Sequence, residues 1–205
     1  MADVRDFRIG VALLAAGASR RFGSADKLAA DLNGRRMGEH AAAALPMEHC
    51  AQSWVIVSSL PHQCEAFWKT RGLATVQNPD ADQGMGTSVA LAARLATAAG
   101  CDALLIALAD MPCVPRDHFE ALIHAFEEGA QIAVSAAGDT CMPPAIFGAA
   151  LFEILEASHG DQGARTLIQT GRRVPCPPEW LIDVDTPQAL AQALAALQKS
   201  KPAPS

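Results

Sequence analysis

The sequence contains no tyrosine, and phenylalanine and tryptophan together supply only 5% of its 205 residues. It has no apolar run of the roughly 18 residues that a membrane-spanning helix requires, so we do not expect an integral membrane protein. Basic residues are fewer than acidic ones, 16 against 22, and the net charge of −6 argues against a protein that coats nucleic acid. The first ten residues mix acidic with basic side chains and lead directly into an apolar segment, unlike a signal peptide. We therefore expect a soluble cytoplasmic protein with neither a membrane nor a nucleic acid as its partner.

The six cysteines form no C-x-x-C pair, and neither they nor the six histidines cluster in the sequence. In a chain of this size without a signal peptide, reduced thiols with a structural role are favoured over disulfides. His118 and His124 are six residues apart, a spacing that does not place them on one face of a helix. We therefore do not expect a zinc site. The cysteines are Cys50, Cys64, Cys101, Cys113, Cys141 and Cys176.

Half of the residues are hydrophobic, which is enough for a sizeable core, and 42 of them are alanine. Short apolar runs, typical of strands buried on both faces, alternate along the chain with longer alanine-rich segments, typical of helices. We expect strands at Ile9–Ala15, Ser53–Ser59, Leu73–Gln77 and Asp102–Ala109, with weaker candidates at Gln131–Ser135, Pro144–Phe147, Val174 and Leu181–Val184. Helices are expected near residues 38–45, 61–70, 86–99, 115–128, 148–157, 163–170 and 186–199.

The alternation of strands and helices predicts an α/β fold whose mostly parallel sheet is covered by helices on both faces. No internal repeat or linker divides the sequence, so we expect one domain at residues 1–197 and a flexible C-terminal tail at residues 198–205. Ligands bind such sheets beyond the carboxyl ends of the strands. The polar segments that follow the expected strands are therefore candidates for the site: 16–27, 78–88, 110–112, 141–144 and 183–185.

The loop after the first expected strand combines small residues with cations. Its sequence, LAAGASRRFGSADKL over residues 14–28, contains neither G-x-x-x-x-G-K-[ST] nor G-x-G-x-x-G. The small side chains of Ala16 and Gly17 would let the backbone approach a phosphate, and Arg21 and Lys27 would supply charge from a polar loop. A basic surface loop without a ligand is the alternative interpretation.

Five segments, in order along the chain, resemble the signature of one enzyme family. They are L-A-A-G-x-x-x-R-F-G-x-x-x-K-L at 14–28, N-P with G-M-G-T-S at 78–88, L-A-D-M-P at 108–112, G-D-Q-G-A-R at 160–165 and D-V-D-T-P at 183–187. Together they cover roughly residues 8–197 and resemble the MobA-like NTP transferases, within these the molybdenum cofactor cytidylyltransferases. The resemblance implies a three-layer α/β/α Rossmann-like nucleotidyltransferase fold with a mostly parallel central sheet.

The reaction that the resemblance implies is attack by a phosphate oxygen of molybdopterin on the α-phosphate of CTP, with release of pyrophosphate. Positioning, Mg²⁺ and Arg or Lys side chains suffice for such a reaction, which needs no protein nucleophile. The resemblance implies catalytic roles for Arg21, Lys27 and Asp110, and it implies that Asp110 and Asp183 ligate the Mg²⁺ ion. Asp185 is expected instead to begin the following helix, although the choice between Asp183 and Asp185 as the second ligand stays open.

Two binding sites follow from the same resemblance. The nucleotide site would consist of Ala15, Ala16, Gly17, Asn78, Gly84 and Ser88, and the acceptor site of Pro143, Gly160, Asp161, Gly163 and Arg165. Guanylyl-transferring relatives usually have a second glycine where this sequence has Ala16, and related cytidylyltransferases use a serine at the position of Ser88 to contact the base. Both features favour CTP.

Two departures from the family's pattern leave the acceptor open. Relatives usually read Gly-[His/Asn]-Pro where this sequence reads Cys141-Met142-Pro143, and Arg36 replaces a proline in the segment after Lys27. Another phosphorylated acceptor is therefore an alternative to molybdopterin. A carrier that loads a client molybdoenzyme without turnover and a reductase on the same scaffold are further alternatives. The charged residues of the family's motifs are present here as Arg21, Lys27, Asp110 and Asp183, which argues against the carrier. No dinucleotide fingerprint supports the reductase.

Overall fold

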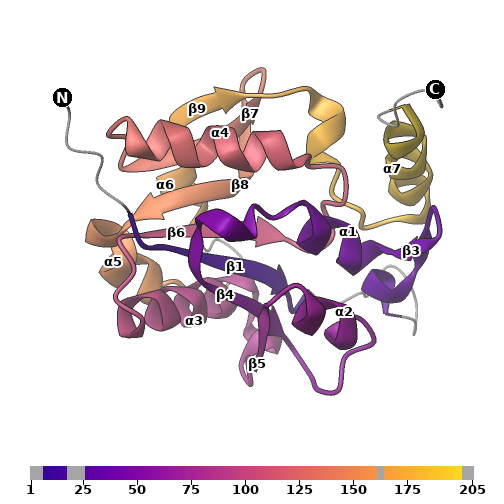
Figure 1. Cartoon of the computed structure of the whole chain (residues 1–205), viewed down its shortest axis with the longest axis horizontal. Helices are drawn as coiled ribbons and strands as arrows, with labels where there is room; N and C mark the ends of the chain where they lie inside the picture. The colour runs from indigo at the N-terminus through magenta and orange to yellow at the C-terminus, as the bar shows by residue number, and fades with distance from the viewer. Residues whose placement is uncertain (1–6, 18–25, 161–163, 200–205) are drawn as a thin grey trace.

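The computed structural model of the chain describes residues 7–17, 26–160 and 164–199. Its centre is a seven-stranded sheet with the strand order β5-β4-β1-β6-β8-β7-β9 (Figure 1). The parallel pairs are β1 with β4 and β6, β4 with β5, and β7 with β9, whereas β8 is antiparallel to β6 and β7. The strands are β1 (Ile9–Ala15), β4 (Cys50–Val57), β5 (Ala74–Gln77), β6 (Ala103–Leu108), β7 (Ile132–Ala137), β8 (Thr140–Gly148) and β9 (Arg172–Pro175).

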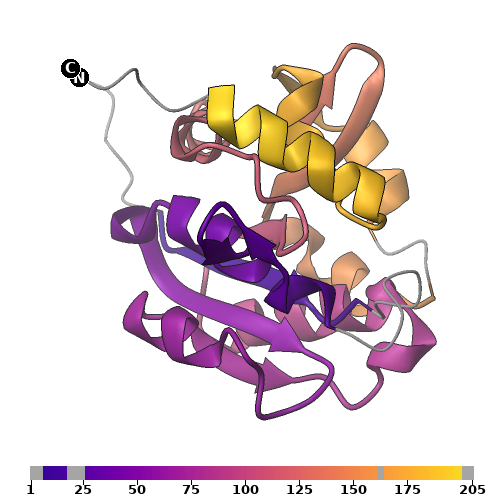
Figure 2. The same cartoon turned by 90° about the vertical axis from the view of Figure 1, so that its right-hand side faces the viewer.

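Helices cover both faces of this sheet, with α1 and α4 on one face and α3, α5 and α6 on the other (Figures 1 and 2). The expected three-layer α/β/α Rossmann-like fold with a mostly parallel sheet is therefore confirmed. The α-helices are α1 (Met37–Ala44), α2 (Glu65–Thr70), α3 (Met85–Ala98), α4 (Arg116–Glu127), α5 (Phe152–Glu156), α6 (Arg165–Gln169) and α7 (Pro187–Lys199). Short 3₁₀ helices are η1 (Lys27–Ala29), η2 (Met47–His49), η3 (Ala81–Gln83), η4 (Ala149–Leu151) and η5 (Pro178–Leu181).

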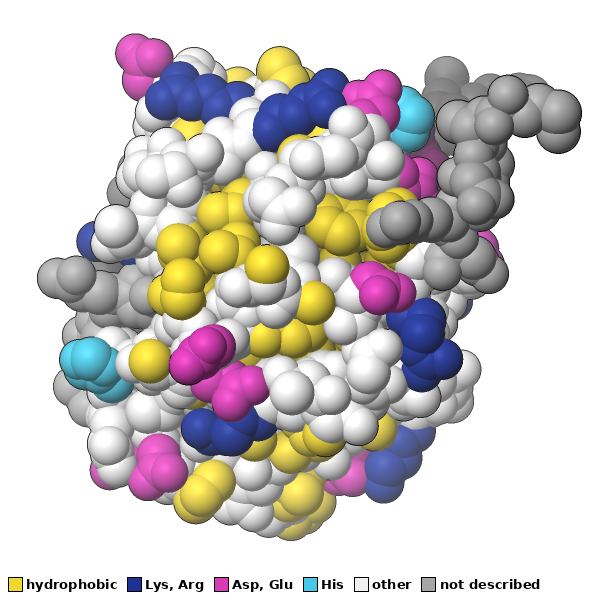
Figure 3. Space-filling view, turned by 90° about the vertical axis from the view of Figure 1, so that its left-hand side faces the viewer, with side chains coloured by type: hydrophobic (Ala, Val, Ile, Leu, Met, Phe, Trp, Pro, Cys, Tyr) yellow, Lys and Arg dark blue, Asp and Glu magenta, His cyan; other side chains and the backbone are white. Residues whose placement is uncertain are grey.

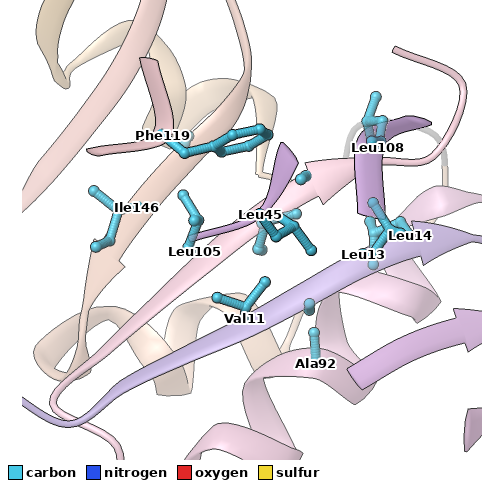
Figure 4. Close-up of a cluster of buried hydrophobic side chains, with 14 of the residues drawn as sticks. Val11, Leu13, Leu14, Leu45, Ala92, Leu105, Leu108, Phe119 and Ile146 are labelled. Atoms are coloured by element: carbon cyan, nitrogen blue, oxygen red, sulfur yellow. The ribbon is translucent and has the colours of Figure 1, made fainter. Parts of the chain in front are cut away.

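The core lies between the helices and the central strands. β1 and β6 are buried along their whole length, as their continuous apolar sequences predict. On the face covered by α4, Phe119 packs near Leu105 and Ile146, and all three side chains are almost completely inaccessible to solvent (Figure 4). On the opposite face the buried side of α3 consists largely of alanine, so this helix lies close to the sheet. These alanines are Ala90, Ala92, Ala93 and Ala96.

The strands differ from our expectations in two places. Leu181–Val184 forms no strand, because η5 extends to Leu181 and the chain then continues without regular structure to α7. A hairpin that we did not expect consists of β2 (Asp31–Leu32) and β3 (Arg35–Arg36). Its two-residue turn is formed by Asn33 and Gly34, which have φ angles of 61° and 80°. An Asn-Gly pair is a strong signal for such a turn, so the sequence did contain the necessary information.

The edge at which β1 and β6 end is the one where ligands bind in sheets of this kind. Both strands point towards the right of Figure 1, and Figure 2 faces this edge. Figure 3 shows the opposite face, where charged and apolar side chains are interspersed.

All six cysteines are free, and burial raises the pKa of the Cys50 and Cys64 thiols to about 12, so these two stay protonated at neutral pH. No described helix has both the length and the apolar character needed to cross a membrane.

Candidate active site

Three carboxylates meet beyond the carboxyl end of β6. Asp110 follows this strand directly, whereas Asp183 and Asp185 lie in the segment between η5 and α7. The backbone N–H of Val184, which is completely buried between the two aspartates, donates to the carbonyl oxygen of Asp110 at 3.0 Å. Each of the three aspartates has a carboxylate oxygen within 4.8 Å of one from each of the others. Residues more than 70 positions apart in the sequence thus form one acidic cluster.

Lys27 lies against this acidic cluster and is only 4% exposed. Its Nζ donates to Oδ2 of Asp110 at 2.7 Å and also to Oδ1 of Asp185. Burial by itself would lower the pKa of Lys27, but the negative charge and hydrogen bond of Asp110, together with those of Asp185, outweigh it and raise the pKa. The ammonium group is therefore charged at neutral pH. The sequence placed Lys27 on a polar loop, whereas the structure buries it at the start of η1 against the acidic cluster.

One oxygen of Asp110 is available for a further ligand. Its Oδ1 is buried and has no hydrogen-bond partner among the described residues, although a buried carboxylate oxygen without a partner is costly. The donor set is three carboxylates, the hard oxygen ligands that Mg²⁺ and Mn²⁺ accept. The arrangement therefore fits a divalent cation, and it brings together Asp110 and Asp183, the two residues that we expected to hold one.

Asp185 belongs to the acidic cluster and does not cap α7. The hydroxyl of Thr186 accepts a hydrogen bond from the backbone N–H of Ala189 at 3.1 Å, which is the role of an N-cap. The carboxylate of Asp185 instead pairs with Lys27. The interpretation of Asp185 as a helix-start residue is therefore wrong, and all three aspartates are candidates for metal binding.

A contact between Asp26 and His62 that we did not expect lies next to Lys27 in the structure. Asp26 caps η1 by accepting from the backbone N–H of Leu28 at 3.0 Å, and its Oδ2 lies 3.1 Å from Nε2 of His62. The His62 hydrogen bond outweighs burial and lowers the pKa of the Asp26 carboxyl. His62 itself stacks on the buried Trp68, with the ring centroids 4.6 Å apart. No sequence motif pairs residues 26 and 62, so only the fold reveals this contact.

The expected nucleotide-binding residues after β1 lie at the same edge. Ala15 ends this central strand and Ala16 is buried just after it, while Gly17 is exposed. A Cβ atom added to Gly17 would have no neighbour within 4 Å among the described atoms, so the fold itself does not require glycine there. Arg21 lies outside the described residues.

Asn78 and Gly84 belong to the segment that joins β5 to α3, and Ser88 lies in the first turn of α3. Asn78 is buried, and its Nδ2 donates to the hydroxyl oxygens of Thr87 and Ser88, each at 2.9 Å. Gly84 has a φ of 110°, which favours glycine, and precedes α3 directly. These contacts shape the loop from within. Because Ser88 is only 3% exposed, its contact with a nucleotide base stays a prediction.

The acceptor-site residues Pro143 and Arg165 line one cavity, together with Asp183 of the acidic cluster. The cavity has a volume of about 320 Å³, and most of its wall is apolar, including Leu14, Val89 and Met142. Gly160 lies at the base of the adjacent loop, where its carbonyl oxygen accepts from the backbone N–H of Gly86 at 2.7 Å. Asp161 and Gly163 lie outside the described residues.

Comparison with known proteins finds a family match and a relative for this chain. Residues 11–175 match the family described as the MobA-like NTP transferase domain. The purine catabolism protein PucB of Bacillus subtilis (strain 168) is 34% identical over 178 residues, which are 81% of this chain and 82% of that protein.

Two solved structures have the same fold. A homologue of Rv0371c of Mycobacterium tuberculosis, from Mycobacterium sp. strain JC1, is 25% identical with a TM-score of 0.77, covering 95% of this chain and 98% of that one. The molybdopterin-guanine dinucleotide biosynthesis protein A of Archaeoglobus fulgidus is 18% identical with a TM-score of 0.64, covering 93% and 99%. The family match spans most of the sequence and includes Lys27, Asp110 and the loop at residues 78–88. The chain therefore belongs to the MobA-like NTP transferases, a family of nucleotidyltransferases.

Proposed function

We propose that the protein transfers CMP from CTP to the phosphate of molybdopterin, in a Mg²⁺-dependent reaction that releases pyrophosphate. The observation that carries this proposal is the position of the acidic cluster and Lys27 beside the cavity lined by Pro143 and Arg165. A nucleotide bound at the carboxyl end of β1 and an acceptor in the cavity would meet at these charged groups.

In the proposed reaction, an oxygen of the acceptor phosphate forms a bond to the α-phosphorus of CTP. The bond between the α-phosphorus and the bridging oxygen breaks, and pyrophosphate leaves with the electron pair. Both reactants are anions, so the site has to offset their repulsion and stabilise the charge that concentrates in the transition state. Lys27 is suited to this role because its ammonium stays protonated and is held at a fixed place by two carboxylates. Arg21 would add a second positive charge.

We propose that Asp110 and Asp183 hold the Mg²⁺ ion, with Asp185 as a third ligand or as the fixed partner of Lys27. The buried Oδ1 of Asp110, without a partner among the described residues, supports this assignment. When bound, Mg²⁺ would supply charge stabilisation on the phosphate oxygens. The aspartates would orient that charge towards the cavity, since Asp183 lines it.

Two residues support CTP as the nucleotide. Ala16 is buried directly after β1, and in the proposed site its methyl group would take up space that a glycine would leave to a larger base. The hydroxyl of Ser88 lies in the first turn of α3, and a hydroxyl both donates and accepts hydrogen bonds. Ala15, Gly17, Asn78 and Gly84 would complete the nucleotide site by shaping the backbone around the phosphates and base.

The cavity suits an acceptor with an apolar body and one anionic group. Its wall is largely apolar, and Arg165 supplies a positive charge close to the acidic cluster. Gly160, Asp161 and Gly163 would contribute from the residues that precede Arg165 in the sequence. The Archaeoglobus fulgidus relative is named for molybdopterin-guanine dinucleotide biosynthesis, which supports molybdopterin as the acceptor. Cys141 and Met142, where relatives usually have Gly-[His/Asn], favour a second candidate: transfer to another phosphorylated acceptor that tolerates an apolar wall.

The test is pyrophosphate release with molybdopterin and each of the four NTPs in turn. We expect CTP to exceed GTP by at least about tenfold in kcat/KM, which corresponds to about 1.4 kcal/mol, and Ala16→Gly should narrow this difference. A preference for GTP would contradict the cytidylyl assignment while leaving the metal site intact. Tight binding of molybdopterin without pyrophosphate release from any NTP would instead indicate a carrier.

A further inference from the structure

A buried chain of hydrogen bonds lies behind one wall of the cavity. The pairing of β7 with β8 is regular up to Val134 and Ala145, after which Ser135 pairs with Met142. Pro143 and Pro144 are therefore left out of the ladder and form a bulge. Proline has no N–H to donate to a neighbouring strand, which explains why the ladder breaks at this position. Met142 and Pro143 face the cavity, so this bulge shapes the acceptor site.

The bulge is tied to α4 through two side chains that solvent does not reach. The hydroxyl of Ser135 donates to the carbonyl oxygen of Pro144 at 2.7 Å, and Nε2 of His118 lies 2.8 Å from the same hydroxyl oxygen. Ser135 is 0% and His118 is 3% exposed. Since Ser135 has a single proton and gives it to the carbonyl, the proton between Ser135 and His118 has to come from the imidazole. The direction of both hydrogen bonds is thus determined.

The imidazole of His118 also contacts an aromatic ring. Trp180 of η5 contacts the ring edge-on, with the centroids 5.6 Å apart and the planes at 61°. Burial lowers the pKa of His118, which agrees with a neutral ring whose proton resides on Nε2. Burying a polar group is costly unless it is hydrogen-bonded, and Nε2 of His118 has such a partner in Ser135.

We propose that His118 is a positioning residue for the acceptor, which holds the Pro143–Pro144 bulge through Ser135 and so sets the shape of the cavity wall. This inference rests on the proposed function, because it takes the cavity to be the acceptor site. The proposed nucleotide-binding residues lie at the end of β1, in the segment before α3 and in the first turn of α3, and the hydrogen bonds among His118, Ser135 and Pro144 do not involve them. Loss of these hydrogen bonds should therefore weaken binding of the acceptor more than binding of the nucleotide.

The kinetic test compares His118→Leu, Ser135→Ala and His118→Gln in transfer from CTP to molybdopterin. Leucine removes both ring nitrogens, and we expect the KM for molybdopterin to rise by about tenfold, equivalent to about 1.4 kcal/mol, while the KM for CTP changes less than about twofold. Ser135→Ala should have the same effect, and the double variant should be no worse than either single one. His118→Gln keeps an N–H donor at a similar reach and should restore most of the loss.

A matched control separates positioning from a general loss of stability. Leu122 is completely buried on the same helix and has no group that hydrogen-bonds, so Leu122→Ala should lower the melting temperature without changing the ratio of the two KM values. Equal increases in both KM values in His118→Leu, or a His118→Gln variant as impaired as His118→Leu, would overturn the proposal.

A measurement without turnover distinguishes failure of this inference from failure of the proposed function. In the protein without ligands, amide hydrogen exchange in the peptide covering residues 140–147 should be faster in His118→Leu and Ser135→Ala than in the wild type. Exchange in the peptide covering residues 84–92 should be unchanged. Faster local exchange together with no nucleotidyl transfer by the wild type would uphold the role of His118 in holding the wall and refute the assigned reaction. Unchanged exchange at 140–147 would refute the role of His118, whatever the wild type transfers.

Discussion

At the scale of single residues, the site consists of three carboxylates and the buried ammonium group of Lys27, which pairs with two of them. Asp110 takes part in both features of the site, because one of its oxygens pairs with Lys27 and the other has no hydrogen-bond partner among the described residues. Replacing one carboxylate therefore changes metal binding and the partner of Lys27 together. Asp110→Asn tests the effect on metal binding, and Lys27→Met tests the contribution of the ion pairs.

Asp110→Asn removes the charge that would hold a cation but keeps the shape of the side chain and one oxygen that accepts from Lys27. We expect turnover with CTP and Mg²⁺ to fall at least about a hundredfold, a loss of a few kcal/mol of transition-state stabilisation, with little change in fold. The measurement is kcat for pyrophosphate release across a Mg²⁺ titration. Asp117→Asn, an exposed aspartate in the first turn of α4, is the control and should retain full activity. Near-normal turnover of Asp110→Asn at saturating Mg²⁺ would contradict the assignment of this ligand.

Lys27→Met keeps the bulk of the side chain and removes the ammonium group that pairs with Asp110 and Asp185. We expect a loss of about 1–3 kcal/mol in the free energy of unfolding at neutral pH, limited by the half-exposed position of Asp185. Because the pKa of Lys27 is raised, its contribution is complete below the unfolded value of 10.5 and is lost as pH rises through the folded value. Urea denaturation at several pH values measures this difference.

Lys69→Met is the matched control for Lys27→Met. Lys69 is exposed and pairs with Glu65 one turn away on α2, a surface pair worth only a few tenths of a kcal/mol. A Lys27→Met variant as stable as Lys69→Met would show that the buried ion pairs do not contribute to folding.

Lys27 also shows what the sequence could and could not reveal. Its place in the L-A-A-G…K-L segment predicted a charged role, and the structure brings it to Asp110 as that role requires. Its burial was not predictable, because its partners Asp110 and Asp185 lie 83 and 158 positions away in the sequence. The contacts of Asp26 with His62 and of His118 with Ser135 were missed for the same reason: each joins elements that only the fold brings together.

At the scale of secondary-structure elements, the apolar pattern predicted the helices and the strands β1, β5 and β6 well and the strand β8 poorly. β1 and β6 are continuous apolar runs that have few alternatives to a buried strand. β8 was predicted as a short strand at Pro144–Phe147, but it begins at Thr140 and is antiparallel. Two adjacent prolines interrupt its apolar pattern, and the direction of a strand depends on how the chain returns to the sheet.

The contact between the start of α3 and the loop at residues 159–160 is an element-scale feature with a sharp test. A Cβ atom added to Gly86 would lie 2.6–2.7 Å from backbone atoms of His159, and backbone atoms cannot move aside as a flexible side chain can. We expect Gly86→Ala to push the start of α3 away from the loop at residues 159–160 and to break the 2.7 Å hydrogen bond to Gly160. The protein should be destabilised by about 1–3 kcal/mol. Thermal denaturation measures the loss.

Gly17→Ala is the comparison for Gly86→Ala, since an added Cβ atom at Gly17 meets no described atom within 4 Å. It should leave the melting temperature unchanged but weaken CTP binding, if the backbone at this position approaches the phosphates. A destabilised Gly17→Ala variant, or a Gly86→Ala variant as stable as the wild type, would contradict these assignments.

At the scale of the whole molecule, the site consists of segments from nearly the entire length of the chain. The end of β1, the residues around Lys27, the loop at 78–88, Asp110 and the segment at 183–185 all meet at one edge of the sheet. The order of these segments in the sequence predicted the fold, because a parallel sheet brings the carboxyl ends of its strands together. The acceptor could not be predicted in the same way, since the shape of its cavity depends on the bulge in β8 and on packing behind it.

A site assembled from distant segments couples ligand binding to the stability of the whole fold. A ligand that binds only the folded protein stabilises it by RT ln(1 + [L]/Kd), about 2.7 kcal/mol at a concentration 100 times Kd. We therefore expect CTP with Mg²⁺ to raise the melting temperature by several degrees, since about 1 kcal/mol shifts a domain of this size by roughly 2–4 °C. GTP with Mg²⁺ should have a smaller effect, and chelation of the metal should abolish most of the increase. Asp110→Asn should respond to neither nucleotide. An equal increase with CTP in the presence and absence of Mg²⁺ would show that the acidic cluster takes no part in nucleotide binding.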